Sequence, residues 1–323
     1  MTMEPAAAGM ASETVTDVLA DVGADAPLVD APPLAATPVD GRLRRTWRFV
    51  RADRRLLFGL TYLALVLVAS ALATLYLQDP IAQDLDSLVA GPSGAHWLGT
   101  DDLGRDVLSR LVHGALTSLT AAAVAVGVAA VIGVTIGIVA GFFGGLVDAV
   151  IMRVVDTLLA FPGLVLAVGV VAMLGPGLLN AMTAVGLVFS PVLARIVRAQ
   201  VLSARESLFV DASRTFGSSP WQIIRRHILP NTMPPIIVQL ALLFAVALLA
   251  EAGLSFIGLG VQPPDPSWGS MLGRAYRFMR QAPLQVVIVG AVIMLTALAF
   301  NAIGDALRDA LDPRRRRGRP GVR

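Results

Sequence analysis

The chain has 323 residues, of which 55% are hydrophobic and only 15% charged, and its mean hydropathy is +0.71. A soluble domain carries about 25% charged residues, so this composition indicates a membrane protein. The chain has no cysteine and no lysine. It therefore cannot form disulfides, Cys-ligated metal sites or the lysine phosphate loop of nucleotide hydrolases, and any energy from ATP must come from a partner. The net charge of +3 comes with arginine runs around the hydrophobic region, which indicate membrane topology rather than nucleic-acid binding.

The first segment differs in composition from the rest of the chain. Residues 1–40 contain seven acidic residues and no basic ones. Such a segment buries too little apolar surface to fold, so residues 1–45 are predicted to be a disordered tail. The segment lacks the positive start of a signal peptide. A second, basic tail is predicted for residues 312–323.

Six apolar runs are each long enough to cross a bilayer as a helix, which takes about 20 residues. The first span and an external segment fill residues 46–112, and a five-helix core fills residues 113–311. The expected spans are Leu56–Leu77, a stretch between His113 and Asp148, Val154–Gly175, Leu178–Ala194, Ile236–Ile257 and Leu284–Ile303. The fold class expected is therefore an all-α integral membrane protein.

Arginine distribution predicts the orientation of these spans. With the N-terminus inside, 21 arginines fall on the cytoplasmic side and five on the external side. Basic residues concentrate in cytoplasmic loops, so both termini are expected in the cytoplasm.

Small residues recur every fourth position in the second span, at Ala129, Gly133, Gly137, Gly141 and Gly145. This spacing places them on one helix face, where a second helix can approach closely. The pattern predicts a helix–helix seam, either static or part of a moving bundle.

The longest cytoplasmic loop, residues 195–235, carries two amphipathic patterns. Leu208, Ala212 and Phe216 form one apolar stripe, and Gly217 is suited to end that helix. A second helix is expected to begin at the N-cap Ser219, to carry Trp221, Ile224 and Ile228 on one side, and to be interrupted by Pro230. The apolar faces could lie on lipid headgroups, pack on the same chain, or dock into a cytosolic protein, and the pattern alone does not choose among these.

The same loop resembles the "EAA" loop of ABC-importer permeases, which reads Glu-Ala-Ala, three residues, Gly, nine residues, Ile, any residue, Leu-Pro. The matching residues here are Asp211, Ala212, Ser213, Gly217, His227, Leu229 and Pro230. The chain departs from the pattern at Asp211, Ser213 and His227. In that family the loop inserts into a cleft of the ATPase subunit, so the resemblance favours docking into a cytosolic protein.

Three further segments narrow the resemblance to the second ("C") permease subunit of dipeptide, oligopeptide and nickel importers. They are WLGTDDLGRD at residues 97–106, EAGLSFIGLGVQPPDPSWG at residues 251–269, and GDALRDALDP at residues 304–313. The resemblance implies a type I importer bundle, a heterodimer with a homologous permease, two ATPase subunits that bind ATP and Mg, and an external substrate-binding protein. It implies no cofactor or metal on this chain and a bacterial plasma-membrane location.

Two acidic residues lie within the expected spans and are candidates for the translocation path. Glu251 could line or gate the path, or could make a structural hydrogen bond near the outer mouth. Asp156 could also contribute, or could pair with Arg153 one turn away. The acids at positions 101, 102 and 106 are expected on a solvated external surface that touches the binding protein. No catalytic or metal-binding constellation emerges, because the three histidines fall on opposite sides of the membrane.

The sequence therefore predicts a non-catalytic permease subunit of an ATP-driven importer, which works by alternating access. Substrate identity stays open, because dipeptide, longer-peptide, nickel-chelate and glutathione carriers share these signatures. The rival hypothesis is a proton-coupled secondary transporter that uses Asp156 and Glu251.

Overall fold

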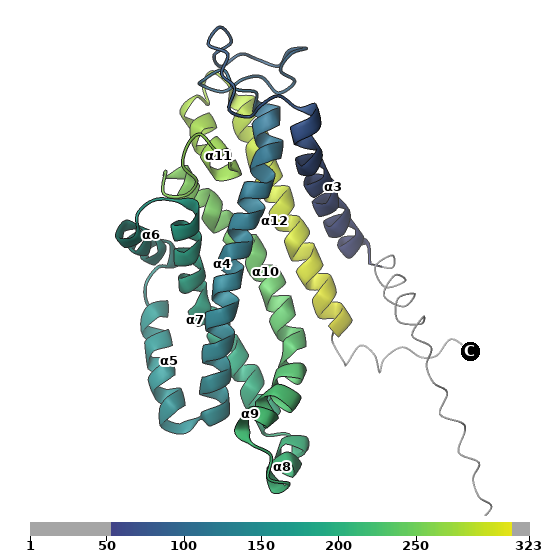
Figure 1. Cartoon of the computed structure of the whole chain (residues 1–323), viewed down its shortest axis with the longest axis vertical. Coiled ribbons are helices and arrows are strands. Elements are labelled where there is room, and N and C mark those ends of the chain that lie inside the picture. The colour runs from purple at the N-terminus through teal and green to yellow at the C-terminus, as the bar shows by residue number, and fades with distance from the viewer. Residues whose placement is uncertain (1–52, 312–323) are drawn as a thin grey trace, which may run out of the picture. The chain divides into compact units, whose positions relative to one another are not determined.

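The computed structural model describes residues 53–311. The expected tails, residues 1–45 and 312–323, lie outside the described residues. Within residues 53–311 every regular element is helical (Figure 1). We call the end of the bundle that carries α8 (Leu208–Thr215) and α9 (Pro220–Ile223) the α8 end. The opposite end carries α11 (Trp268–Arg277) and residues 77–106, and we call it the α11 end.

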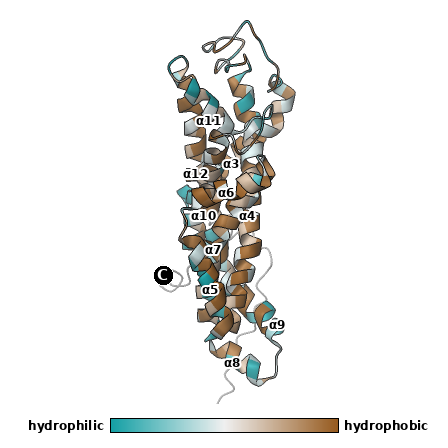
Figure 2. Cartoon of the chain, turned by 90° about the vertical axis from the view of Figure 1, so that its left-hand side faces the viewer, coloured by the Kyte–Doolittle hydropathy of each residue, from teal (hydrophilic) through white to brown (hydrophobic). Residues whose placement is uncertain are grey.

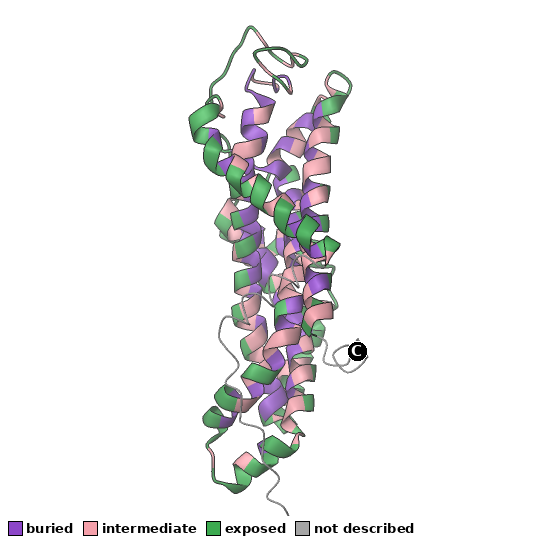
Figure 3. Cartoon of the chain, turned by 90° about the vertical axis from the view of Figure 1, so that its right-hand side faces the viewer, coloured by how far each residue is buried: buried purple, intermediate pink, exposed green. Residues whose placement is uncertain are grey.

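Long apolar helices build the bundle. Within the described residues, five are long and apolar enough to cross a membrane, and a bent helix pair raises the number to six if it counts as one span. The five are α3 (Arg54–Tyr76), α4 (Val107–Phe143), α7 (Leu178–Arg205), a run that ends in α10 (Leu229–Phe256), and α12 (Pro283–Leu311). Hydrophobic residues predominate along the middle of the bundle (Figure 2). Large apolar side chains such as Leu65, Val68 and Leu75 are exposed on α3, as expected of a surface in contact with lipid. Exposed positions run along the length of this helix in Figure 3.

The third expected span is not one straight helix. Residues expected to form Val154–Gly175 belong instead to α5 (Gly145–Leu159) and α6 (Gly163–Leu174), which are bent by 94°. The bend falls at Pro162, which has no N–H to donate into the preceding turn and restricts the residue before it. The start of α5 is also earlier than predicted, because Gly144 adopts a positive φ of 67° and ends α4.

The predicted glycine seam lies between α4 and α7. A Cβ atom on Gly133, Gly137 or Gly141 would come within 2.6–2.9 Å of α7 atoms, and one on Gly186 of α7 would come within 2.6 Å of α4. The two backbones can approach this closely only because these positions carry no side chain. Gly145 is not part of the seam: it begins α5, and nothing lies within 4 Å of the place its Cβ would take.

Ion pairs join α5 to α7. Arg198 donates two hydrogen bonds to Asp148, at 2.5 and 2.6 Å, and Arg195 donates one to Asp156 at 2.5 Å. The expected intrahelical partner of Asp156, Arg153, makes no ion pair within residues 53–311. The prediction of an Asp156–Arg153 pair was therefore wrong, because arginines that we assigned to a loop lie on a helical extension of α7 and point at α5.

Candidate functional site

The segment between α7 and α10 contains the two short helices expected from the sequence. It is shorter than the predicted loop 195–235, because α7 continues to Arg205 and the next long helical run starts at Pro220. Between α8 and α9, Gly217 has a φ of +75°, and its N–H donates to the carbonyl of Arg214 at 2.9 Å. Ser219 then caps α9 by accepting a hydrogen bond from the backbone N–H of Gln222 at 3.3 Å. These are the glycine bend and the N-cap that the sequence predicts.

Pro230 does not interrupt the second helix, contrary to expectation. The run from Pro220 to Phe256 is a single helical span of 37 residues. A π-helical turn, η1 (Ile224–Ile228), joins α9 to α10, and the N–H of Leu229 donates to the carbonyl of Ile224, five residues earlier. This wider turn replaces the four-residue hydrogen bonding that proline disrupts, so the helix accommodates Pro230.

Two departures from the family pattern contact one another. The hydroxyl of Ser213 lies 3.0 Å from Nε2 of His227, and the ring of Phe209 lies 6.0 Å from the histidine ring, centroid to centroid. These contacts join α8 to η1. The third departure, Asp211, is 62% exposed and forms an ion pair with Arg214 at 3.4 Å.

The apolar side chains of this segment divide into two groups. Val210, Ile223 and Ile228 are at most 2% exposed and pack with residues of α4 and α7 such as Phe142 and Val197. The second group projects outward: Leu208 is 87%, Phe216 89% and Trp221 69% exposed. The predicted stripe of Leu208, Ala212 and Phe216 is therefore exposed, whereas the second predicted stripe is split, with Ile224 and Ile228 buried. Packing on the same chain accounts for only one of the two groups.

Glu251, a path candidate, lies inside the bundle near the α11 end. Its side chain is fully buried, and Oε1 accepts a hydrogen bond from the Ser255 hydroxyl at 2.7 Å. Within residues 53–311 its side chain therefore has no surface open to solvent. The other path candidate, Asp156, lies on α5 with its side chain 59% exposed.

Asp101, Asp102 and Asp106 are largely buried, contrary to the expectation of a solvated surface. Asp101 and Asp106 are 8% and 7% exposed, and each is held by a basic partner. Arg105 donates to Asp101 at 2.8 Å, Arg274 lies 3.3 Å from Asp102, and Nδ1 of His96 lies 2.9 Å from Asp106.

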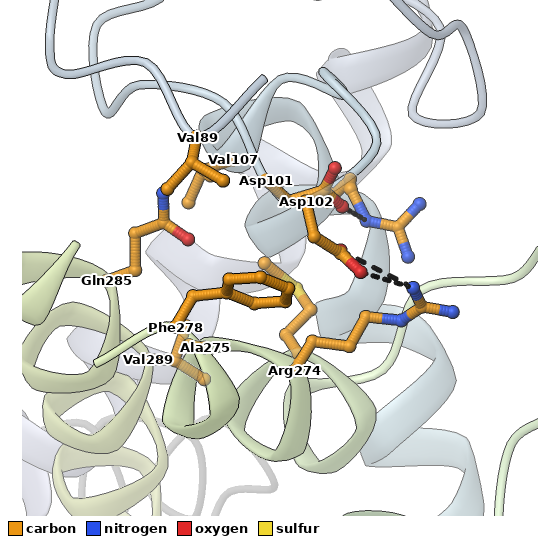
Figure 4. Close-up of a pocket in the computed structure, with 11 residues that line it drawn as sticks. Val89, Asp101, Asp102, Val107, Arg274, Ala275, Phe278, Gln285 and Val289 are labelled. Carbon is orange, nitrogen blue, oxygen red and sulfur yellow. Dashed lines mark hydrogen bonds and ion pairs between the residues drawn. The ribbon is translucent and has the colours of Figure 1, made fainter. Parts of the chain in front are cut away.

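Figure 4 shows three members of this cluster, Asp101, Asp102 and Arg274, beside a small cavity of about 20 Å³, about the room that one water molecule needs. Gln285 of α12 donates a hydrogen bond to the backbone carbonyl of Thr100, next to the cluster, at 2.7 Å. Asp102 thus ties residues 77–106 to α11, Asp101 lies 3.5 Å from Arg110 of α4, and Gln285 supplies the contact with α12. The described part of the chain holds no group of three or more His, Asp or Glu side chains placed to bind a metal ion.

A family model, "Binding-protein-dependent transport system inner membrane component", matches residues 133–317. The chain belongs to this family: it is a multi-pass inner-membrane permease component of an ABC transport system that works with ATPase subunits, and it is not the catalytic component. A proton-coupled secondary transporter is accordingly not retained.

The relatives are peptide and glutathione permeases. The dipeptide permease DppC of Alkalihalophilus pseudofirmus is 40% identical over 84% of this chain and 90% of its own. The glutathione permease GsiD of Pectobacterium atrosepticum is 42% identical over 87% and 96%, and the probable D,D-dipeptide permease DdpC of Escherichia coli is 43% identical over 73% and 79%. Among solved structures, the MetNI methionine ABC transporter aligns with a TM-score of 0.49 and 20% identity over 62% of this chain and 97% of that chain.

Proposed function

We propose that this chain forms half of the translocation path of an ATP-driven importer of di- and oligopeptides. Its partners are a second, homologous permease subunit, two ATPase subunits and an external substrate-binding protein. The peptide class rests on the relatives, whose names give dipeptides, D,D-dipeptides and glutathione as their cargo. All of these compounds are short chains of amino acids joined through amide bonds.

In this proposal the α8 end is cytoplasmic and the α11 end is external, with both termini inside. The arginine distribution supports this orientation, because it would put 21 arginines on the inner side and five on the outer side, and basic residues concentrate on the cytoplasmic side. The segment of residues 77–106, held by its buried ion pairs, would then form an external cap, and the binding protein would deliver substrate above it. Glu251 and Asp156 stay predictions for the translocation path.

The ATPase would bind the segment that contains Asp211, Ala212, Ser213, Gly217, His227, Leu229 and Pro230. The observation that carries this proposal is the division of its apolar side chains. Val210, Ile223 and Ile228 fix the segment to the bundle, while Phe216 and Trp221 project outward. Large aromatic side chains bury much surface when a partner covers them, and they are typical anchors of protein interfaces. A groove in the ATPase would cover them without any change in the fold of this chain.

The test is to replace Phe216 and Trp221 with serine in the assembled transporter. The matched control replaces Leu75, which is 74% exposed on the surface of α3 that we expect to contact lipid, with serine. We expect the double variant to insert normally, to lose the ATPase subunits on purification, and to lose ATP-driven peptide uptake. The control should keep both properties. ATPase association and uptake that survive in the double variant would refute the docking assignment.

A further inference from the structure

Glu251 forms the centre of a buried polar cluster that has no basic partner within residues 53–311. Ser255 donates to its Oε1 at 2.7 Å, and Oε2 has no hydrogen-bond partner among the described residues. The hydroxyl groups of Ser118 and Ser267 also lie beside the carboxyl group. A carboxyl group in the interior of a membrane bundle is costly, and such groups are found where they serve a specific contact.

The cluster joins three parts of the chain. Ser118 belongs to α4, Ser255 to the last turn of α10, and Ser267 caps α11. The Ser255 hydroxyl also accepts from the N–H of Val261, at 3.3 Å, and the Ser118 hydroxyl accepts from the N–H of Trp268, at 3.0 Å. The carboxyl group of Glu251 therefore lies between hydroxyl groups that hold the turn after α10 and the first residue of α11.

Close backbone packing fixes α11 against the end of α10. A Cβ atom on Gly269 would lie 2.7 Å from the Cα of Ala252, and one on Gly273 would lie 2.9 Å from the carbonyl oxygen of Phe256. Two glycines one turn apart thus bring the two helices into backbone contact. Contacts this close leave little room for α11 to slide over α10.

At its other end α10 is continuous with the proposed ATPase-docking segment. The helical run starts at Pro220, passes through η1 and ends at Phe256. Because α11 is fixed to the last turn of α10, the run connects the segment carrying Trp221 to the ion pair between Arg274 of α11 and Asp102.

We propose that Glu251 is a positioning residue that fixes α11 to the end of α10, so that a displacement imposed on α9 by the ATPase reaches the external cap. The inference rests on the proposed function, because it needs an ATPase that acts on α9. The role belongs to the hydrogen-bonding geometry of the side chain and not to its charge. Glutamine, which has the same shape and can also accept from Ser255, should replace glutamate, whereas leucine should not.

The experiment compares Glu251→Gln with Glu251→Leu in the complete reconstituted transporter, with the binding protein and a dipeptide supplied. Three quantities are measured: ATPase association, ATP hydrolysis and dipeptide uptake. We expect Glu251→Leu to keep the ATPase and its hydrolysis while uptake per ATP falls roughly tenfold, a typical size for coupling between distant sites. Glu251→Gln should keep all three. Normal uptake in Glu251→Leu, or an equal loss in Glu251→Gln, would overturn the proposal, the latter because it would make the charge essential.

A second measurement applies even if Glu251→Leu assembles poorly. The rings of Phe256 in α10 and Tyr276 in α11 lie 5.6 Å apart, centroid to centroid, and the chain has no cysteine of its own. Cysteines at these two positions, joined by a short thiol cross-linker, should leave uptake intact in the otherwise native chain, because the two helices move together. The same cross-link should restore uptake to Glu251→Leu. Loss of uptake on cross-linking the native background would overturn the proposal.

The outcomes separate this inference from the proposed function. Phe216→Ser with Trp221→Ser tests whether the ATPase binds at all, and its readout is association. Glu251→Leu leaves association in place and changes only how much uptake each hydrolysed ATP produces.

Discussion

Replacing glycine with alanine at two positions of α4, one inside the seam with α7 and one outside it, should change the free energy of unfolding in opposite directions. At Gly137 a Cβ atom would lie 2.6 Å from the Cβ of Val197 and 2.7 Å from the carbonyl oxygen of Ala194. Ordinary contacts are 3.4–4 Å, so α7 would have to move away by about 1 Å along a packed interface. At Gly127 in the same helix, nothing lies within 4 Å of the corresponding position.

The magnitudes follow from these distances. Overpacking costs about 1–3 kcal/mol, while replacing a helical glycine with alanine gains about 1 kcal/mol from helix propensity. Gly137→Ala should therefore lower the free energy of unfolding by up to about 2 kcal/mol, because the clash offsets and then exceeds the propensity gain. Gly127→Ala should raise it by up to about 1 kcal/mol, since only the gain applies.

The assay is reversible unfolding of the purified chain in mixed micelles, with helical content followed by circular dichroism as denaturing detergent is added. The purified wild-type chain provides the reference midpoint. Shifts of the same sign and size at Gly127 and Gly137 would refute the reasoning, because they would mean that the α4–α7 contact does not depend on the missing side chain.

Two further predictions concern the α8 end. Gly217→Ala should impose about 1–2 kcal/mol of backbone strain at φ +75°, although a Cβ atom there would have open space, so peptide uptake should fall. Asparagine tolerates this backbone conformation better than alanine, so Gly217→Asn should keep more of the uptake. Uptake that is equal in these two variants would contradict this reasoning. Asp148→Arg should lower the free energy of unfolding by up to about 1 kcal/mol, a small effect because the ion pair with Arg198 is only partly buried. Combining Asp148→Arg with Arg198→Asp reverses the pair and should recover most of this loss in unfolding measurements. A double variant no more stable than Asp148→Arg alone would show that the pair contributes little.

The positions of the long helices could be predicted from the sequence, but their ends could not. Apolar runs locate a membrane helix because the bilayer requires about 20 such residues, and this signal stops where charged residues begin. Arg195 and Arg198 therefore indicated a loop, although they continue α7 and pair with acids of α5. The amphipathic helix α11 was missed altogether; Ser267 and Ser270, which form its capping box, were the signal available in the sequence.

The candidate site shows the same limit. Gly217 and the Ser219 cap act through neighbouring residues, and their roles could be predicted from local spacing. The contact between Ser213 and His227 joins residues 14 positions apart, and only the packing of α8 on η1 reveals it. Asp102 was expected in solvent because its basic partner Arg274 lies 172 positions further along the chain.

The unbroken helical run from Pro220 to Phe256 has a consequence for the size of the motion that the transporter needs. At 1.5 Å per residue its 37 residues extend about 55 Å, well beyond the roughly 30 Å thickness of the hydrocarbon layer. A tilt of only about 5° at one end would carry the other end sideways by about 5 Å, comparable with the pitch of one helical turn. Small angular changes at the α8 end would thus suffice for ångström-scale displacement at the α11 end.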